Sequence, residues 1–152
     1  MTTRSRRRRP GPAGEPSLGR LTPCAVCPHR VTSVRGYLGE DNPVDFYRAS
    51  VTHEGRVPCH EQIDYSDPDW EVTQLPRADL CAGQLIHFRN MMKVPRHPAL
   101  ALAVAAVKHS KAVFTWPWEF LAHHMPGATE EEVQAAMRQA LTPAPWTGDD
   151  EG

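Results

Sequence analysis

The sequence predicts a small, helix-rich α+β domain with short extended segments only, organised around a four-cysteine metal site. A chain of 152 residues has room for one domain plus tails. Its 15 prolines, 10 glycines and hydrophobic content of 40% indicate a small, loop-rich core. A core of this kind is where a structural metal contributes most to stability. The third observation is the spacing of the cysteines.

The four cysteines are Cys24, Cys27, Cys59 and Cys81. Two thiolates separated by two residues can hold one metal from a single tight turn, which fits Cys24 and Cys27. Cys81 falls at the start of an expected helix, where the helix dipole favours the thiolate that a metal requires. We therefore predict that all four bind one metal, with His60, beside Cys59, as an alternative ligand.

The spacing leaves the metal open between two kinds of site. Zinc commonly takes four thiolates, but its familiar signature has two Cys-x-x-Cys pairs and this chain has one. A single pair followed by Pro28 is also typical of a 4Fe-4S cluster. We favour zinc and keep the cluster as the alternative. A redox pair at Cys24 and Cys27 is disfavoured, because no convincing strand precedes it.

The elements begin with a basic arm over residues 1–20, which carries six arginines against one glutamate. Its composition offers almost no apolar surface to offset the entropy of ordering, so we expect disorder. Arginine–phosphate contacts would let such an arm bind nucleic acid or another polyanion. The arginines expected to make these contacts are Arg4, Arg6, Arg7, Arg8 and Arg9.

Helices account for most of the remainder. Asn42 followed by Pro43 predicts a helix start and a short helix over 43–50. An extended segment over 56–60 would deliver Cys59, and an acidic surface loop follows over 61–71. Apolar periodicity predicts helices over 78–92 and from 97 to 107, and Pro117 opens a short helix ending near 124.

The last helix is signalled by Thr129 and Glu132, which form a capping-box pattern before an amphipathic stripe. We therefore divide the chain into the arm, a metal-centred domain over 21–125, a C-terminal amphipathic helix over 126–142 and a flexible acidic tail over 143–152. The C-terminal helices are the expected site for a protein partner.

The apolar runs and the cysteines indicate the cellular compartment of the protein. The longest apolar run, residues 99–107, is far short of a bilayer span, and no apolar stretch follows the arginines as in a signal peptide. We expect a cytoplasmic protein without membrane contact. In a reducing compartment the cysteines are metal ligands or redox groups rather than structural disulfides.

Three short motifs carry a resemblance to known proteins. They are Cys24-x-x-Cys27-Pro28-x-Arg30, then Pro58-Cys59-His60, then Cys81-Ala82-Gly83. Over roughly residues 22–90 this ordered set resembles a family of small uncharacterised proteins of bacteria and their phages. Relatives often have an aromatic residue where this chain has His29. The resemblance implies a common cysteine site and no particular reaction.

The sequence lacks the motifs of common catalytic sites. It contains no phosphate-binding glycine loop, no nucleophile elbow and no His-Glu-x-x-His. A closed four-thiolate site leaves zinc no open position for water. We therefore predict a non-enzymatic, metal-stabilised binding or regulatory module, with an iron–sulfur redox or sensor protein as the alternative.

Overall fold

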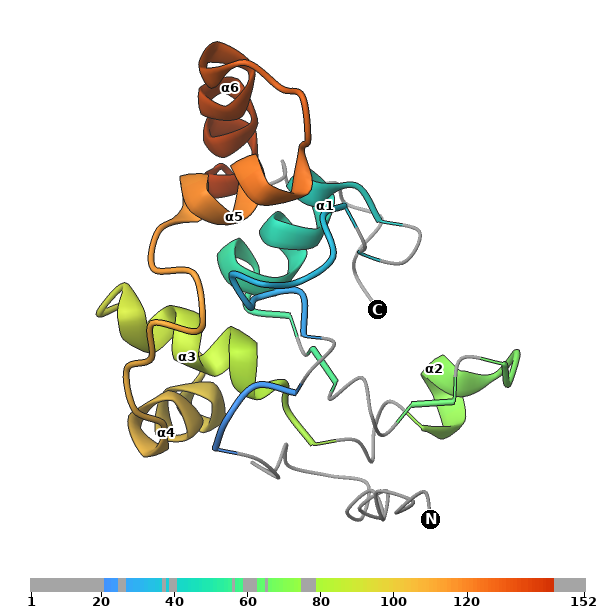
Figure 1. Ribbon diagram of the computed structural model, residues 1–152. Coiled ribbons are helices and arrows are strands. Elements are labelled where there is room, and N and C mark those ends of the chain that lie inside the picture. The colour runs from blue at the N-terminus through green and yellow to red at the C-terminus, as the bar shows by residue number, and fades with distance from the viewer. Residues whose placement is uncertain are drawn as a thin grey trace, which may run out of the picture.

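The described part of the chain folds into two groups of helices (Figure 1). The computed structural model describes residues 21–24, 27–36, 38, 41–55, 57–58, 63–64, 66–74 and 79–143. One group contains α1 (Pro43–Tyr47), the π-helix η1 (Arg48–Thr52), α5 (Pro117–His124) and α6 (Glu130–Leu141). The other contains α3 (Ala82–Asn90) and α4 (Pro98–Ala106). The short helix α2 (Trp70–Thr73) lies apart from both groups.

The prediction of an α+β class is wrong for the described residues, which contain helices and no strand. Among the residues that the structure describes, the extended segments pair at two isolated antiparallel bridges, Arg30 with Val113 and Pro58 with Leu80. Longer ladders are disfavoured because these segments are short and interrupted by proline, which has no N–H to donate. The extended segments therefore act as single points of attachment between helices.

The predicted helix starts are confirmed by their caps. The Asn42 side chain accepts the Asp45 N–H at 2.9 Å, with Pro43 in the first turn of α1. At α6 the Thr129 hydroxyl accepts the Glu132 N–H, and the Glu132 carboxylate accepts the Thr129 N–H. Each bond satisfies a backbone donor that the helix cannot pair internally.

The core lies between the two helix groups. Tyr47, Phe88 and Phe120 are its largest fully buried side chains. The Gln84 amide on α3 donates to the carbonyl of Ser50, at 2.6 Å, and to that of Gly55, at 3.0 Å. These bonds attach α3 to the end of η1, so the two groups share one interior.

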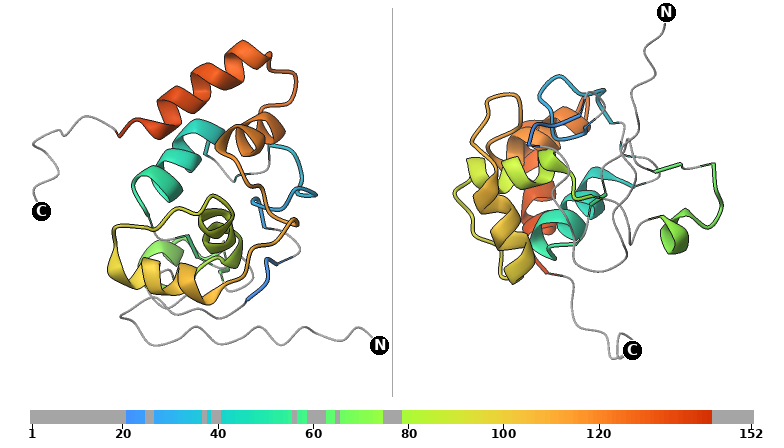
Figure 2. Two further views of the ribbon diagram at one scale, coloured as in Figure 1. Left: turned by 90° about the vertical axis from the view of Figure 1, so that its left-hand side faces the viewer. Right: turned by 90° about the horizontal axis from the view of Figure 1, so that it is seen from below.

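The C-terminal helix packs on the rest of the fold, as the left view of Figure 2 shows. The apolar stripe of α6 is buried at Val133, Ala136 and Ala140 against α1, η1 and α5. The Thr52 hydroxyl also donates to the carbonyl of Ala140 at 2.6 Å. Within the described residues, no helix has the length and apolar character needed to cross a lipid bilayer.

Candidate metal site

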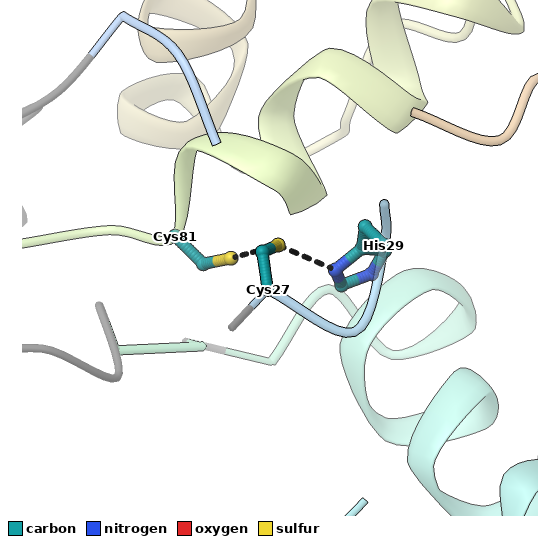
Figure 3. Close-up of side chains that lie close together, drawn as sticks. All are labelled: Cys27, His29 and Cys81. Carbon is teal, nitrogen blue, oxygen red and sulfur yellow. Dashed lines mark hydrogen bonds between the residues drawn. The ribbon is translucent and has the colours of Figure 1, made fainter. Parts of the chain in front are cut away.

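Two thiols and one imidazole meet in the interior, on the side of α3 where that helix begins (Figure 3). The residues are Cys27, His29 and Cys81, which are 0%, 0% and 3% exposed. The two Sγ atoms lie 3.6 Å apart, and the Sγ of Cys27 lies 3.8 Å from Nδ1 of His29. All three ligand atoms fall within 4.8 Å of one another. This group can hold a metal ion.

Two of the three distances between ligand atoms, those that involve Cys27, match the edges of a tetrahedral site. With Zn–S bonds of about 2.3 Å and Zn–N bonds of about 2.0–2.1 Å, tetrahedral angles place two sulfurs about 3.8 Å apart. The same bonds place a sulfur and a nitrogen about 3.6 Å apart. The observed separations of 3.6 and 3.8 Å differ from these values by roughly the tolerance expected of metal–ligand geometry. Two thiols and an imidazole are also a donor set that zinc commonly takes.

Two consecutive turns place Cys27 and His29 on the same side of the chain. The Cys27 N–H donates to the Cys24 carbonyl at 3.2 Å, and the Arg30 N–H donates to the Cys27 carbonyl at 3.1 Å. The Arg30 guanidinium then donates to the carbonyls of Cys24 and Pro23, each at 2.8 Å. We call these two bonds the Arg30 clamp. They hold Pro23 and Cys24, where the first turn begins, and give the arginine of the motif a structural role.

Cys81 enters the site from the opposite direction, as the residue that precedes α3. Its N–H donates to the Val57 carbonyl at 2.8 Å, next to the Pro58–Leu80 bridge. Gly83 follows in the first turn of α3, where a β-carbon would collide with the Sγ of Cys27. The absence of a side chain at Gly83 therefore lets the helix approach the thiols.

Two histidines at the end of α5 hold the loop that follows Cys27. Nε2 of His124 donates to the Pro28 carbonyl at 2.8 Å, and its Nδ1 accepts the Gly36 N–H at 3.1 Å. Nε2 of His123 donates to the Ser33 carbonyl at 2.7 Å. A carbonyl can only accept, so these bonds fix which ring nitrogen carries the proton. The loop is consequently attached to α5 at both ends.

The pKa values of the two thiols at the site are shifted in opposite directions. The pKa of Cys81 lies well below its ordinary value, chiefly because the Cys27 thiol donates a hydrogen bond to its sulfur, while burial acts in the opposite direction. The pKa of Cys27 is raised by its hydrogen bonds with Cys24 and Cys81 and by burial. Two thiolates this close in the interior repel each other, and a divalent cation between them would remove that penalty.

The prediction of a fold organised around four cysteines is wrong, because the described group contains two cysteines and a histidine. Cys24 is buried in the same apolar cluster as Cys27 and Cys81 but does not belong to the group that shares ligand distances. Cys59 and the alternative ligand His60 lie outside the described residues. The arginines of the basic arm, at positions 4 and 6–9, also lie outside them.

Sequence reasoning missed His29 as a ligand. Its imidazole packs against Phe120, with ring centroids 5.4 Å apart, and its buried Nε2 has no hydrogen-bond partner among the described residues. By contrast, His87 uses both ring nitrogens, accepting from the Tyr47 hydroxyl and donating to the Phe114 carbonyl. The available signal was the position of His29 two residues after a cysteine, which a search for thiols alone passes over.

Comparisons of the chain with protein-family models, with curated proteins and with solved structures found no match. The resemblance to the cysteine-motif family of bacteria and phages therefore stays a prediction.

Proposed function

We propose that the protein is a non-enzymatic binding or regulatory module that a zinc ion stabilises at Cys27, His29 and Cys81. The observation that carries this proposal is the set of three buried ligand atoms within 4.8 Å of one another. They come from two segments far apart in the chain, the loop after Cys24 and the start of α3. A metal there would attach these segments in the folded state only, and its binding energy would therefore add to folding stability.

The donor set supports zinc over an iron–sulfur cluster. A 4Fe-4S cluster is typically held by four thiolates, whereas zinc accepts mixtures of thiolate and imidazole. His29 lies as close to the Sγ of Cys27, at 3.8 Å, as one ligand of a single ion lies to another. An iron–sulfur redox or sensor protein remains the alternative that metal analysis excludes or establishes.

A fourth ligand is needed for a closed tetrahedral site, and two cysteines are available. Cys24 is 5% exposed and is buried in the same cluster as Cys27 and Cys81. Cys59 follows Pro58, which pairs with Leu80, the residue before Cys81. A third thiolate from either residue would complete a site of three cysteines and one histidine. Loss of metal in only one of Cys24→Ser and Cys59→Ser identifies the ligand.

Burial of the ligands supports a structural role for the metal. Catalytic zinc sites keep an open position that water and substrate can reach. Here the exposed fraction of each described ligand is 3% or less. Turnover by the metal-loaded protein that disappears on substitution of a polar residue other than cysteine would contradict a non-enzymatic role.

The decisive experiment is metal analysis of the full chain purified without oxygen, together with an absorbance scan. We expect a colourless protein with about one zinc per chain, because a single closed site binds one ion. A brown protein that contains iron and sulfide would show that the site holds an iron–sulfur cluster and not zinc. A metal-free protein whose stability does not change on addition of zinc would overturn the proposal altogether.

The proposed role also includes a cellular location and two kinds of binding partner. We propose a cytoplasmic location, where thiols stay reduced, and contact of the basic arm with nucleic acid. Replacing the arginines at positions 4 and 6–9 by glutamine should weaken nucleic-acid retention, most strongly at low salt. A protein partner for the C-terminal helices would use exposed residues, because the apolar stripe of α6 is buried in the core.

A further inference from the structure

A second concentration of positive charge lies in the folded body itself. Residues 80–118 contain five lysines and arginines and no aspartate or glutamate, although the whole chain carries 18 acidic residues. This segment includes α3, α4 and the chain that follows α4. A typical protein surface mixes both signs of charge, whereas the charged side chains of this stretch are all positive.

Hydrogen bonds of Asn90 attach the end of α3 to the loop that carries Lys108 and Lys111. The Asn90 amide donates to the Ser110 carbonyl at 2.9 Å, and its oxygen accepts the Ser110 N–H at 3.1 Å. The loop after α4 is thereby attached to the last residue of α3. We call the four cations within three residues of this contact the basic edge. They are Arg89, Lys93, Lys108 and Lys111.

All four residues of the basic edge are exposed, and the backbone beneath them is ordered by further bonds. The Lys93 N–H donates to the Phe88 carbonyl at 3.0 Å, and Asn90 also donates to the Val113 carbonyl at 3.1 Å. The left view of Figure 2 looks onto the side where α3 ends. The Glu54 carboxylate interacts electrostatically with Lys93, and its two oxygens accept the N–H groups of Arg96 and His97.

We propose that the basic edge is a nucleic-acid contact surface that binds the phosphate backbone without reading the base sequence. Four cations held on two adjoining segments can each neutralise a phosphate and release condensed counterions. The basic edge alone offers only charge, which positions a protein on nucleic acid but does not specify a sequence.

An anionic membrane surface fits the basic edge less well. Helices that lie on membranes carry lysine and arginine along the polar face of an amphipathic helix. Helix α4, the apolar element of this region, contains no lysine or arginine between Pro98 and Ala106. The cations instead lie in the last turn of α3 and in loops, an arrangement suited to a curved polyanion rather than to a plane.

This inference extends the nucleic-acid contact proposed for the arm and does not depend on the metal. The two contacts are tested by separate variants of the full chain. One replaces the arm arginines at positions 4 and 6–9 by glutamine. The other replaces the basic edge (R89Q, K93Q, K108Q and K111Q). Both carry the native cysteines, so metal content should not change in either.

The measurement is fluorescence anisotropy of a short labelled DNA duplex of mixed sequence, titrated with each protein at several salt concentrations. The affinity of the basic-edge variant should fall by at least roughly 10-fold at low salt. Its slope of log affinity against log salt should decrease by about one for each phosphate that the variant no longer neutralises. A charge-retaining variant (K93R, K108R and K111R) should bind as the native chain does. A control pair of exposed cations elsewhere (R35Q and R138Q) should change little.

The outcomes separate the two surfaces. Loss of affinity in the basic-edge variant with the arm intact supports the inference, even if the arm variant binds normally. Unchanged affinity and salt slope in the basic-edge variant overturn it, even if the arm variant loses binding. Absence of duplex binding by the native chain overturns both proposals. Sedimentation with vesicles of anionic phospholipid, without duplex binding, would assign the surface to a membrane instead.

Discussion

The α-carbon of Gly83 lies so close to the sulfur of Cys27 that a β-carbon at position 83 would overlap that sulfur. The same β-carbon would lie 3.0 Å from the β-carbon of His29. Gly83 is thus in contact with two of the three residues that can hold a metal. Its place in the first turn of α3 also brings Cys81, two residues earlier, to the other side of the site.

Substitution of Gly83 by alanine should damage the site. Alanine usually stabilises a helix by about 1 kcal/mol relative to glycine, but here the added methyl group must displace the Cys27 loop. We expect the free energy of unfolding to fall by about 1–3 kcal/mol, together with a loss of bound zinc. Urea unfolding and metal analysis of the purified variant measure both effects.

Gly127 supplies the control for this substitution. It has a positive φ of 83°, and a β-carbon there would meet nothing within 4 Å. Gly127→Ala should therefore lower stability by about 1 kcal/mol through backbone strain and leave zinc content unchanged. A stabilised Gly83→Ala protein with full zinc would show that the close approach to Cys27 is not required.

Removal of the imidazole at position 29 should weaken metal binding strongly. His29→Ala deletes a ligand, so the loss of zinc affinity should exceed the roughly 10–100-fold loss seen when an outer partner of a ligand is changed. His29→Cys offers a thiolate from the same position and should recover much of the affinity. Competition with a chromophoric chelator gives the affinities.

His109 is exposed and serves as the matched control, since His109→Ala should leave zinc affinity unchanged. Equal zinc affinity in the native protein and in His29→Ala would show that His29 is not a ligand. The metal, if bound, would then require a different set of ligands.

The hydrogen bonds of Arg30 should increase the zinc affinity of the site, although Arg30 is not itself a ligand. Arg30 holds two carbonyls at once, those of Cys24 and Pro23, and lysine cannot reproduce this planar, two-pronged contact. Arg30→Lys should lower zinc affinity on the order of 10-fold, as expected for an outer partner. The exposed Arg35 is the control, because Arg35→Lys should have no effect on affinity. Unchanged affinity in Arg30→Lys would limit the clamp to a packing role.

His124 should make stability depend on pH. Its pKa is lowered to about 4, mainly because burial disfavours the charged ring. In the unfolded chain a histidine titrates near pH 6.5, so between pH 6.5 and about 4 the unfolded state binds more protons. The free energy of unfolding should therefore fall as pH falls through this window, by up to about 1.4 kcal/mol per pH unit for one proton.

The comparison that isolates this effect is His124→Gln, whose side-chain amide can still donate to the Pro28 carbonyl but does not titrate. Urea unfolding at several pH values should give a shallower dependence for the variant between pH 6.5 and about 4. Release of metal at low pH affects both proteins and cancels in the difference. Parallel pH dependences would show that His124 does not titrate differently in the two states.

The helical part of the fold was largely predictable from local signals. Asn42 before Pro43, and Thr129 with Glu132, act within one turn of the chain, so their effect does not depend on distant residues. The class was misjudged because the sequence of an extended segment does not show what it will pair with. Within the described segments, Pro58 and Leu80 pair at an isolated bridge rather than in a strand.

The sequence by itself determined that Cys27 and Cys81 belong to a buried site, because a Cys-x-x-Cys turn and a cysteine at a helix start are local patterns. Only the tertiary structure decided that His29 joins them and that Gly83 makes room for the thiols. Both facts depend on how the Cys27 loop docks against α3, and α5 helps to set that docking through His124. Contacts between residues 54 and 96 positions apart leave no periodic signal in the chain.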